Sequence, residues 1–377
     1  MSTERPSSYV VGLDLVRFAC TLMVCVFHLS WHKAEMVTAM PFGWIGVQVF
    51  FVISGVVIAN SAARASPLQF LKSRFLRLYP AAWLAAVVNF GLLLSVPLTV
   101  FGAAGVWVDP TPRALWYSLV LGGTTFLTSA YWTLPIELAF YGLILLAIFG
   151  GGVRRFLPVA RLLVLASVPY CILLSRSLVA GFELGWLEFG YGPKNMFLLR
   201  HGIYFAIGMY FWLLNSQRRL ALLDRVLLAL VLLGAGLEIF ARAMQIVGSY
   251  APGPAGPMSV GFLVSGALAI FAVLAAIIYL SLRHARDWVP RPAVARTVRS
   301  LGLLTYPFYL IHEILGATVL HAAQQRGLGP AGALLVALPV IGATAWLIAM
   351  HGEPLLRRAI ERLLGWQGRA TRATLPR

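Results

Sequence analysis

The feature that most constrains this chain is a succession of long apolar runs, each bounded by proline, glycine or a cluster of charges. A helix needs about 20 apolar residues to cross the hydrocarbon layer of a membrane. The chain is 60% hydrophobic and only 11% charged, whereas a soluble domain is roughly 45–50% apolar and 25% charged. This excess predicts an all-α, polytopic bundle of about ten membrane-spanning helices. The predicted spans lie near 10–31, 43–60, 80–101, 133–150, 158–178, 197–214, 220–241, 258–281, 300–320 and 331–350.

One further stretch, 114–130, is apolar but short, and its end is polar. We interpret it as a re-entrant or interfacial segment, because an eleventh crossing would invert the side of every later loop. The remaining loops leave no length for a sizeable soluble domain. The sequence therefore predicts one transmembrane domain over 1–358 and a basic cytoplasmic tail over 359–377.

The formal charge of +17 comes from lysines and arginines that gather in alternate loops. Cytoplasmic loops of membrane proteins retain an excess of these residues. One set of loops, together with both chain ends, holds most of them. This pattern predicts that both termini are cytoplasmic, and it explains the positive charge without a nucleic-acid partner. The opposite loops hold only Lys33, Arg113, Lys194, Arg242 and Arg326.

The three cysteines, Cys20, Cys25 and Cys171, all lie in apolar runs. They form no CxxC pair and have no histidine at ligand spacing. The sequence therefore predicts neither a disulfide framework nor a metal site.

The first run contains three ionisable residues, Asp14, Arg17 and His28. A charge inside a spanning helix costs roughly 2.5–3.5 kcal/mol on insertion scales, so each one invites a functional explanation. On a helix, Arg17 and His28 differ by about 20° in azimuth and about 16 Å in height, and so share one face. Asp14 is placed to pair with Arg17, which leaves His28 able to titrate. The alternative is that His28 only bonds a neighbouring helix.

The fourth run opens with Trp132 and carries a carboxylate, Glu137, inside the predicted span. An unpaired carboxylate would be unstable there, so a partner such as His28 or Arg200 is expected. The alternative is a purely structural ion pair.

The ninth run carries Tyr306, Tyr309 and the pair His312-Glu313. Tyr309 and His312 stand three residues apart and predict a polar stripe that faces the bundle interior.

On the predicted cytoplasmic side, Arg74 and Arg77 stand one helical turn apart beside the third run, with Tyr79 close behind. Two guanidinium groups at this spacing suit the phosphate oxygens of a nucleotide-bearing cofactor. The alternative is ordinary anchoring by positive residues at the membrane surface.

Together these segments resemble acyltransferase family 3, whose members are membrane proteins that acylate envelope polysaccharides and other hydroxyl-bearing acceptors. The resemblance covers about residues 8–358. Thr305 stands where the family pattern has serine, and it keeps the hydroxyl. The motifs that carry the resemblance are Arg17 with His28, 46–55, 74–80, 132–137 with Phe140 and Tyr141, 305–312, and Glu353-Pro354.

The resemblance implies a membrane-bound O-acyltransferase of a bacterial inner membrane that moves an acetyl group from acetyl-CoA to a glycan hydroxyl. It implies that His28 is the catalytic histidine, that Arg17 orients the site, and that Arg74 and Arg77, with Tyr79 beside them, bind CoA from the cytoplasm. Members often carry an additional periplasmic domain, so this chain resembles the membrane-only branch.

His28 would either take the proton of the acceptor hydroxyl or carry the acyl group itself. Glu137 would hold the imidazole or raise its basicity, and Arg17 would polarise the carbonyl. A transporter or flippase with a buried Arg/His/Glu proton relay is the main alternative function, and a non-catalytic assembly subunit is another.

The acceptor, the acyl group and the oligomeric state stay open. A glycan is the first choice of acceptor and a hydrophobic small molecule such as a macrolide the second, while succinyl competes with acetyl as the acyl group. The outer-loop residues suited to contact a sugar are Glu183, Glu188, Lys194 and Asn195.

Overall fold

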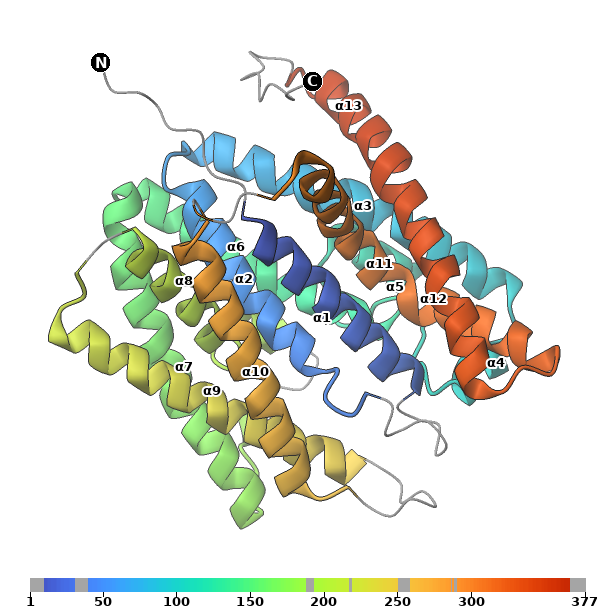
Figure 1. Cartoon of the computed structure of the whole chain (residues 1–377), viewed down its shortest axis with the longest axis horizontal. Coiled ribbons are helices and arrows are strands. Elements are labelled where there is room, and N and C mark those ends of the chain that lie inside the picture. The colour runs from blue at the N-terminus through green and yellow to red at the C-terminus, as the bar shows by residue number, and fades with distance from the viewer. Residues whose placement is uncertain are drawn as a thin grey trace.

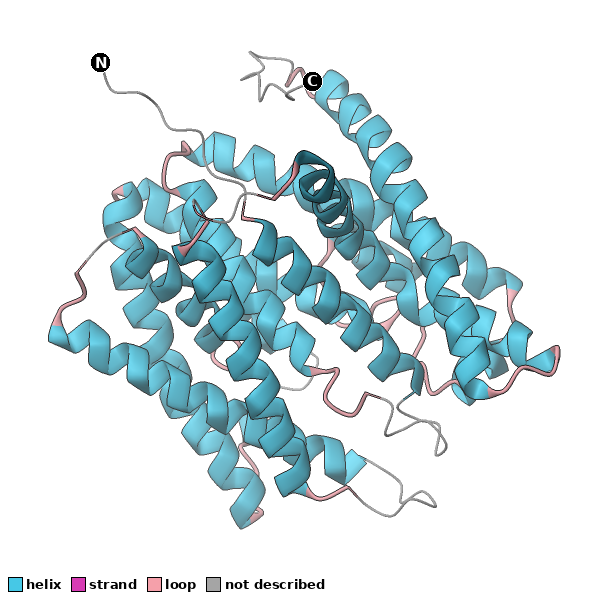
Figure 2. Ribbon diagram, viewed as in Figure 1, coloured by secondary structure: helices cyan, strands magenta, loops and turns pink. Residues whose placement is uncertain are grey.

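The structure is a computed structural model, and it describes residues 10–30, 40–187, 193–216, 219–249, 258–285, 287 and 290–366. Within these residues it consists of helices and loops (Figure 2). The α-helices are α1 (Val11–Ser30), α2 (Ile45–Ala62), α3 (Pro67–Ser95), α4 (Leu98–Ala103), α5 (Pro112–Val120), α6 (Thr133–Phe149), α7 (Phe156–Ala180), α8 (Gly202–Asn215), α9 (Leu222–Ser249), α10 (Val260–Arg283), α11 (Pro292–Gln325), α12 (Pro330–Leu347) and α13 (Glu353–Leu363). The short helical turns are η1 (Ser129–Trp132), η2 (Gly152–Arg155), η3 (Gly185–Leu187), η4 (Pro193–Phe197) and the π-type turn η5 (Ile348–Gly352).

In the described part of the chain, 10 helical segments are long and apolar enough to cross a membrane. Each overlaps one of the ten predicted spans, so the predicted all-α polytopic fold is confirmed. Figure 1 shows α7 and α9 at one flank of the bundle and α12 at the opposite flank, with α1, α2 and α11 between them. The tail predicted over 359–377 begins inside α13, and 367–377 lies outside the described residues, as do Arg5 and Lys33.

The third helix begins earlier than the sequence predicts. The predicted start near 80 assumed that Pro80 opens the span, but α3 starts at Pro67 and keeps Pro80 in its interior. Ser66 accepts a hydrogen bond from Gln69 N at 3.3 Å, and Gln69 Oε1 accepts one from Ser66 N at 3.0 Å, which forms a capping box. Membrane helices tolerate such a proline because neighbouring groups satisfy the freed backbone atoms. Arg74 and Arg77 therefore lie within the helix, not beside it.

The stretch 114–130 does not form an eleventh span. Its helix α5 has only 9 residues, and it packs against α3, where Trp83 Nε1 donates a hydrogen bond to Leu119 O at 2.8 Å. The chain then turns back and pairs Thr128 with Val108 in an isolated antiparallel bridge. The two ends of the segment therefore lie side by side, which agrees with the predicted re-entrant segment.

The centre of the bundle is built on a close approach of α2 and α8. A Cβ atom on Gly55 would lie 2.4 Å from Phe205 O, and one on Gly208 would lie 2.1 Å from Val52 O. Small residues at such crossings allow helix backbones to pack directly. In the apolar part of the span that contains α8, 83% of the residues are buried inside the bundle. The corresponding share for α10 is 28%. The peripheral α10 therefore faces lipid, while α2 and α8 form the interior that supports the site.

Candidate active site

Two cavities open inside the described part of the bundle. We name them from the predicted topology: the inner cavity is lined by Arg17 and has a volume of about 130 Å³, and the outer cavity is lined by His28 and has a volume of about 680 Å³. Val47 on α2 lines both. Arg17 and His28 both face the bundle interior from α1, as their spacing predicts, but each meets a different cavity.

Arg17 is held in the inner cavity by its predicted partner. Its Nη1 lies 3.0 Å from Asp14 Oδ1, and the two side chains are 24% and 13% exposed. Helix α11 comes so close to this pair that a Cβ atom on Gly302 would lie 2.4 Å from the carboxyl carbon of Asp14. The glycine therefore permits the contact between α1 and α11 that fixes the ion pair.

Arg74 and Arg77 line the same inner cavity from α3. The guanidinium carbon of each lies 5.9 Å from the centre of an aromatic ring, Tyr141 for Arg74 and Tyr306 for Arg77. Both distances fall within the range of cation–π attraction. The aromatic rings thus hold the two cations at the cavity wall, where the structure brings them together with Arg17.

Tyr79, which the sequence grouped with these arginines, lies elsewhere. Its hydroxyl donates a hydrogen bond to Val120 O at 3.3 Å, and its ring stacks on Phe75 with centres 4.5 Å apart. The side chain therefore supports the re-entrant segment and does not line the inner cavity.

Glu137 also lines the inner cavity. Its Oε1 accepts hydrogen bonds from Ser54 Oγ at 3.3 Å and from Tyr141 OH at 2.5 Å. The prediction that Glu137 pairs with His28 or Arg200 is therefore wrong. Two other carboxylates, on α11 and α9, take those partners, because helix rotation in the folded bundle turns Glu137 toward α2.

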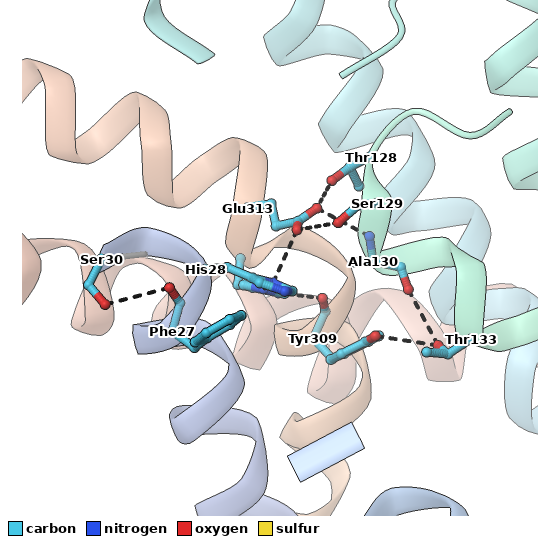
Figure 3. A network of polar contacts seen from close by, with 10 residues as sticks. Phe27, His28, Ser30, Thr128, Ser129, Ala130, Thr133, Tyr309 and Glu313 are labelled. Carbon is cyan, nitrogen blue, oxygen red and sulfur yellow. Dashed lines mark hydrogen bonds and ion pairs between the residues drawn. The ribbon is translucent and has the colours of Figure 1, made fainter. Parts of the chain in front are cut away.

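His28 contacts two residues of α11 through one ring nitrogen. Its Nδ1 lies 2.8 Å from His312 Nε2 and 3.1 Å from Glu313 Oε1 (Figure 3). The rings of His28 and His312 are stacked, with centres 5.1 Å apart and an interplanar angle of 10°. The structure thus brings together the histidine of the first run and the polar stripe of the ninth.

The hydrogen bonds assign the protons of both imidazoles. His312 Nδ1 lies 2.6 Å from Tyr309 O, and since a carbonyl only accepts, a neutral His312 carries its proton on Nδ1 and presents Nε2 as an acceptor. His28 Nδ1 then faces two acceptors, His312 Nε2 and the Glu313 carboxylate. In the neutral form of His28 the proton therefore lies on Nδ1, and Nε2 is the basic nitrogen.

Glu313 is held by the end of the re-entrant segment. Its carboxylate accepts hydrogen bonds from Thr128 Oγ1, from Ser129 Oγ at 2.6 Å and from Ala130 N at 3.1 Å (Figure 3). With His28 these make four donors around a side chain that is 5% exposed. So many donors stabilise the ionised carboxylate despite its burial.

The sequence reasoning named His312 and Tyr309 as site residues but assigned no role to Glu313. The available signal was a second carboxylate inside a predicted span, directly after His312. Its partners could not be foreseen, because they lie about 185 positions away in the chain, at 128–130.

His28, His312 and Glu313 also offer one ligand atom each within 4.8 Å, a grouping that could hold a metal ion. The contacts of 2.8 and 3.1 Å among these atoms are hydrogen-bond distances. The proton assignment accounts for both contacts. We therefore interpret the cluster as a carboxylate–imidazole proton-transfer site.

A thin partition separates this cluster from the inner cavity. Tyr309 lines the inner cavity, its ring centre is 5.6 Å from that of His312, and its hydroxyl accepts a hydrogen bond from Thr133 Oγ1 at 3.4 Å. Figure 3 shows Tyr309 and Thr133 next to the His28 cluster. The arginines and the basic imidazole thus stand on opposite sides of Tyr309 and Val47.

The far wall of the outer cavity carries a second ion pair. Arg200 Nε lies 2.7 Å from Glu238 Oε1, and Tyr204 OH donates to Glu238 Oε2 at 2.6 Å. Trp132 lines this cavity as well, with its ring centre 5.2 Å from that of His201. The sequence reasoning missed Glu238, although a carboxylate inside the seventh predicted span was a signal for a buried partner.

The chain is similar to known proteins over most of its length. A family described as an acyltransferase domain, acyltransferase family 3, matches residues 10–350. No solved structure gives a significant match to the chain.

Three relatives support the same grouping. An exopolysaccharide production protein of Rhizobium meliloti (strain 1021) is 28% identical over 364 residues, which is 91% of this chain and 99% of that protein. Nodulation protein 10 of Rhizobium leguminosarum bv. viciae is 27% identical over 37% of this chain and 44% of its own length. A putative membrane-bound transacylase of Komagataeibacter xylinus is 30% identical over 42% of each chain. Since the family match spans nearly every described helix, the chain belongs to acyltransferase family 3 and is an integral membrane acyltransferase.

Proposed function

We propose that this protein is an acyl-CoA-dependent O-acyltransferase that transfers an acetyl or similar short acyl group to a hydroxyl of an exported glycan. One observation carries the proposal. The Nδ1 atom of His28 contacts the Glu313 carboxylate and the His312 ring nitrogen, so Nε2 is the nitrogen that can act as a base, on the wall of a large internal cavity. The exopolysaccharide production protein among the relatives supports a glycan as acceptor.

The inner cavity is suited to the acyl donor. Arg17, Arg74 and Arg77 line it together, and guanidinium groups bind phosphate oxygens with paired hydrogen bonds. Its volume of about 130 Å³ is below the roughly 300–1,000 Å³ of small-molecule pockets. The cavity would therefore take the extended acyl-pantetheine arm, while the nucleotide stays at the mouth near α3.

The chemical step follows from the proton assignment. Nε2 of His28 takes the proton of the acceptor hydroxyl, and the oxygen attacks the thioester carbonyl. The carbon–sulfur bond then breaks, the acyl group stays on the acceptor oxygen, and the departing thiolate takes the proton from the imidazolium. Glu313 keeps Nδ1 protonated and stabilises the imidazolium, while Arg17 lies in the inner cavity with Arg74 and Arg77, where it would bind the acyl donor. An acyl-imidazole route would use the same nitrogen.

The two substrates would arrive from opposite sides of the membrane. With both termini in the cytoplasm of a bacterial inner membrane, the arginines of α3 face the cytosolic pool of acyl-CoA and the outer cavity faces the exported glycan. The thioester end of the acyl donor would then pass the partition at Tyr309 and Val47 to reach His28.

The test measures release of free CoA thiol by the purified protein in lipid nanodiscs, with acetyl-CoA and exopolysaccharide fragments. We expect acceptor-dependent release in the wild type and a loss of at least about 100-fold in His28→Ala, the range for removal of a general base. The matched control is His321→Ala on the same bundle, because His321 bonds Gln325 and lines neither cavity.

A folded His28→Ala variant that still releases CoA at the wild-type rate would reject the mechanism. A transporter or flippase would move glycan across the membrane without any release of CoA, so the same assay separates the two functions.

A further inference from the structure

Four buried polar atoms without a hydrogen-bond partner among the described residues belong to side chains that line the outer cavity. These atoms are Trp44 Nε1, Gln48 Oε1, Thr125 Oγ1 and His201 Nδ1. The side chains of Trp44, Gln48 and His201 belong to residues that are only 3%, 5% and 5% exposed. A buried polar group without a partner costs about 1–3 kcal/mol, so folded proteins retain such groups mainly where a ligand or water completes them.

These atoms differ in the kind of hydrogen bond that each can make with a ligand. The indole nitrogen of Trp44 only donates, the amide oxygen of Gln48 only accepts, and the hydroxyl of Thr125 does both. A carboxylate can only accept and an ammonium can only donate, so neither satisfies the set. A molecule with several hydroxyl groups satisfies all of them, because each hydroxyl donates and accepts.

The charged groups of this cavity are largely committed to each other. Arg200 is bonded to Glu238 and, through Nη2, to Gln245 Oε1 at 3.0 Å, and Glu313 is bonded to His28. Because these charges neutralise each other, the cavity would recognise a ligand by hydrogen bonds more than by net charge. One further guanidinium, that of Arg242, also lines the cavity.

Aromatic faces and size favour a ring over a linear polyol. Trp107 and Trp132 line the cavity together with Trp44, and flat aromatic rings pack against the apolar C–H face of a sugar while its hydroxyls point to polar groups. The volume of about 680 Å³ lies within the roughly 300–1,000 Å³ of small-molecule pockets. The cavity thus holds a short stretch of a glycan.

We infer that the outer cavity is the acceptor subsite and that Trp44, Gln48, Thr125 and His201 bind a neutral sugar unit there, beside His28. This inference rests on the proposed function for the role of the sugar as acceptor. The binding itself does not need acyl-CoA, so it can be tested separately.

The experiment measures binding of cellotetraose and galactotetraose to the full-length protein in nanodiscs by titration calorimetry, without acyl-CoA. Tetragalacturonate and 1-octanol serve as the acidic and apolar probes. We expect at least one neutral oligosaccharide to bind and the other two probes to bind at least tenfold more weakly. Tighter binding of tetragalacturonate or octanol, or no binding of either neutral sugar, would overturn the inference.

Thr125→Val removes one unpartnered polar atom and keeps the shape of the side chain, whereas Trp44→Phe removes the indole N–H together with one ring of a buried side chain. We expect each to weaken sugar binding at least about threefold, while the melting temperature of Thr125→Val in the absence of sugar stays the same or rises. A purely structural role predicts the opposite, namely a lower melting temperature. The matched control is Tyr210→Phe, which removes another unpartnered buried hydroxyl from a residue that does not line the cavity.

The outcomes separate the two proposals. Sugar binding that is lost in the cavity variants supports the subsite even if no CoA is ever released, and that result would reject only the proposed function. Acceptor-dependent CoA release by a protein whose cavity variants bind sugar as tightly as Tyr210→Phe would overturn the subsite and leave the proposed function intact.

Discussion

The inner and outer cavities are lined by different positions on the same helices, yet they differ in size and in charge. The inner cavity, of about 130 Å³, gathers Arg17, Arg74 and Arg77 around a single lining carboxylate, Glu137. The outer cavity, of about 680 Å³, pairs its carboxylates with cationic partners and leaves neutral polar atoms open. The difference indicates recognition by charge on one side and by hydrogen bonds and shape on the other.

Three helices produce this contrast. Helix α1 carries Arg17 at one level and His28 about three turns later, and α11 carries Tyr306 on the inner cavity and Glu313 on the outer one. Helix α2 contributes to both through Val47. Variants that affect only one end of these helices should therefore affect one substrate and spare the other.

The largest effect after loss of His28 itself is expected from Glu313→Gln. The amide can offer an N–H group to His28 Nδ1, which favours the wrong tautomer, and it no longer stabilises the imidazolium. We expect kcat to fall about 100-fold with little change in the KM for acyl-CoA, measured by CoA thiol release. Glu361→Gln, near the C-terminal end of α13, is the control because Glu361 lines neither cavity. A decrease in kcat of less than threefold would contradict the assigned tautomer.

A smaller and different effect is expected on the inner side. The double variant Arg74→Ala/Arg77→Ala should raise the KM for acyl-CoA about 10- to 100-fold, because charge-assisted hydrogen bonds to phosphate are lost, while kcat changes little. Lysine at both positions should restore part of the affinity, since it keeps the charge without the paired geometry.

Arg64→Ala, an exposed arginine just beyond α2, is the control for this pair. An equal rise in KM for this variant would mean that the positive surface as a whole attracts CoA and that the cavity arginines have no special part.

Ionic strength should separate the cavities without any mutation. Raising salt from about 0.05 to 0.5 M shortens the screening length from roughly 14 to 4 Å, so the KM for acyl-CoA should rise several-fold while the KM for a neutral glycan stays nearly constant. Steady-state CoA release measured against each substrate in turn checks this. Parallel changes in both KM values would remove the proposed contrast.

The smallest effect is expected at the partition. Tyr309→Phe removes a hydroxyl that contacts Thr133 Oγ1 at 3.4 Å, a long hydrogen bond that contributes little. We expect CoA release to change less than about threefold, because the ring that separates the cavities stays in place. Thr133→Val should match it, and a much larger loss in Tyr309→Phe alone would indicate that the phenol contacts a substrate.

The spans could be predicted from the sequence because hydropathy is a local property. The runs near 10–31 and 133–150 lie within a few residues of α1 and α6, and the third span differed only because Ser66 and Gln69 cap the helix ahead of Pro80. The grouping of Arg74 with Arg77 could also be predicted, because both lie on one helix.

Contacts between helices could not be predicted in this way. The partners of Glu137, Glu238 and Glu313 depend on how far each helix is rotated and how closely it approaches its neighbours. Those quantities are set by packing, for example at Gly55 and Gly208. The division of the interior into two cavities, and the turn of Tyr79 away from them, follow from the same packing.

Glu313 accepts hydrogen bonds from Thr128, Ser129 and Ala130, and this affects how related sequences can change during evolution. In the proposed mechanism, the strength of the His28 imidazole as a base depends on a few positions in the segment that carries Thr128, Ser129 and Ala130. Substitutions there can retune reactivity while the number of crossings, their order and the arginines on the far side all stay unchanged.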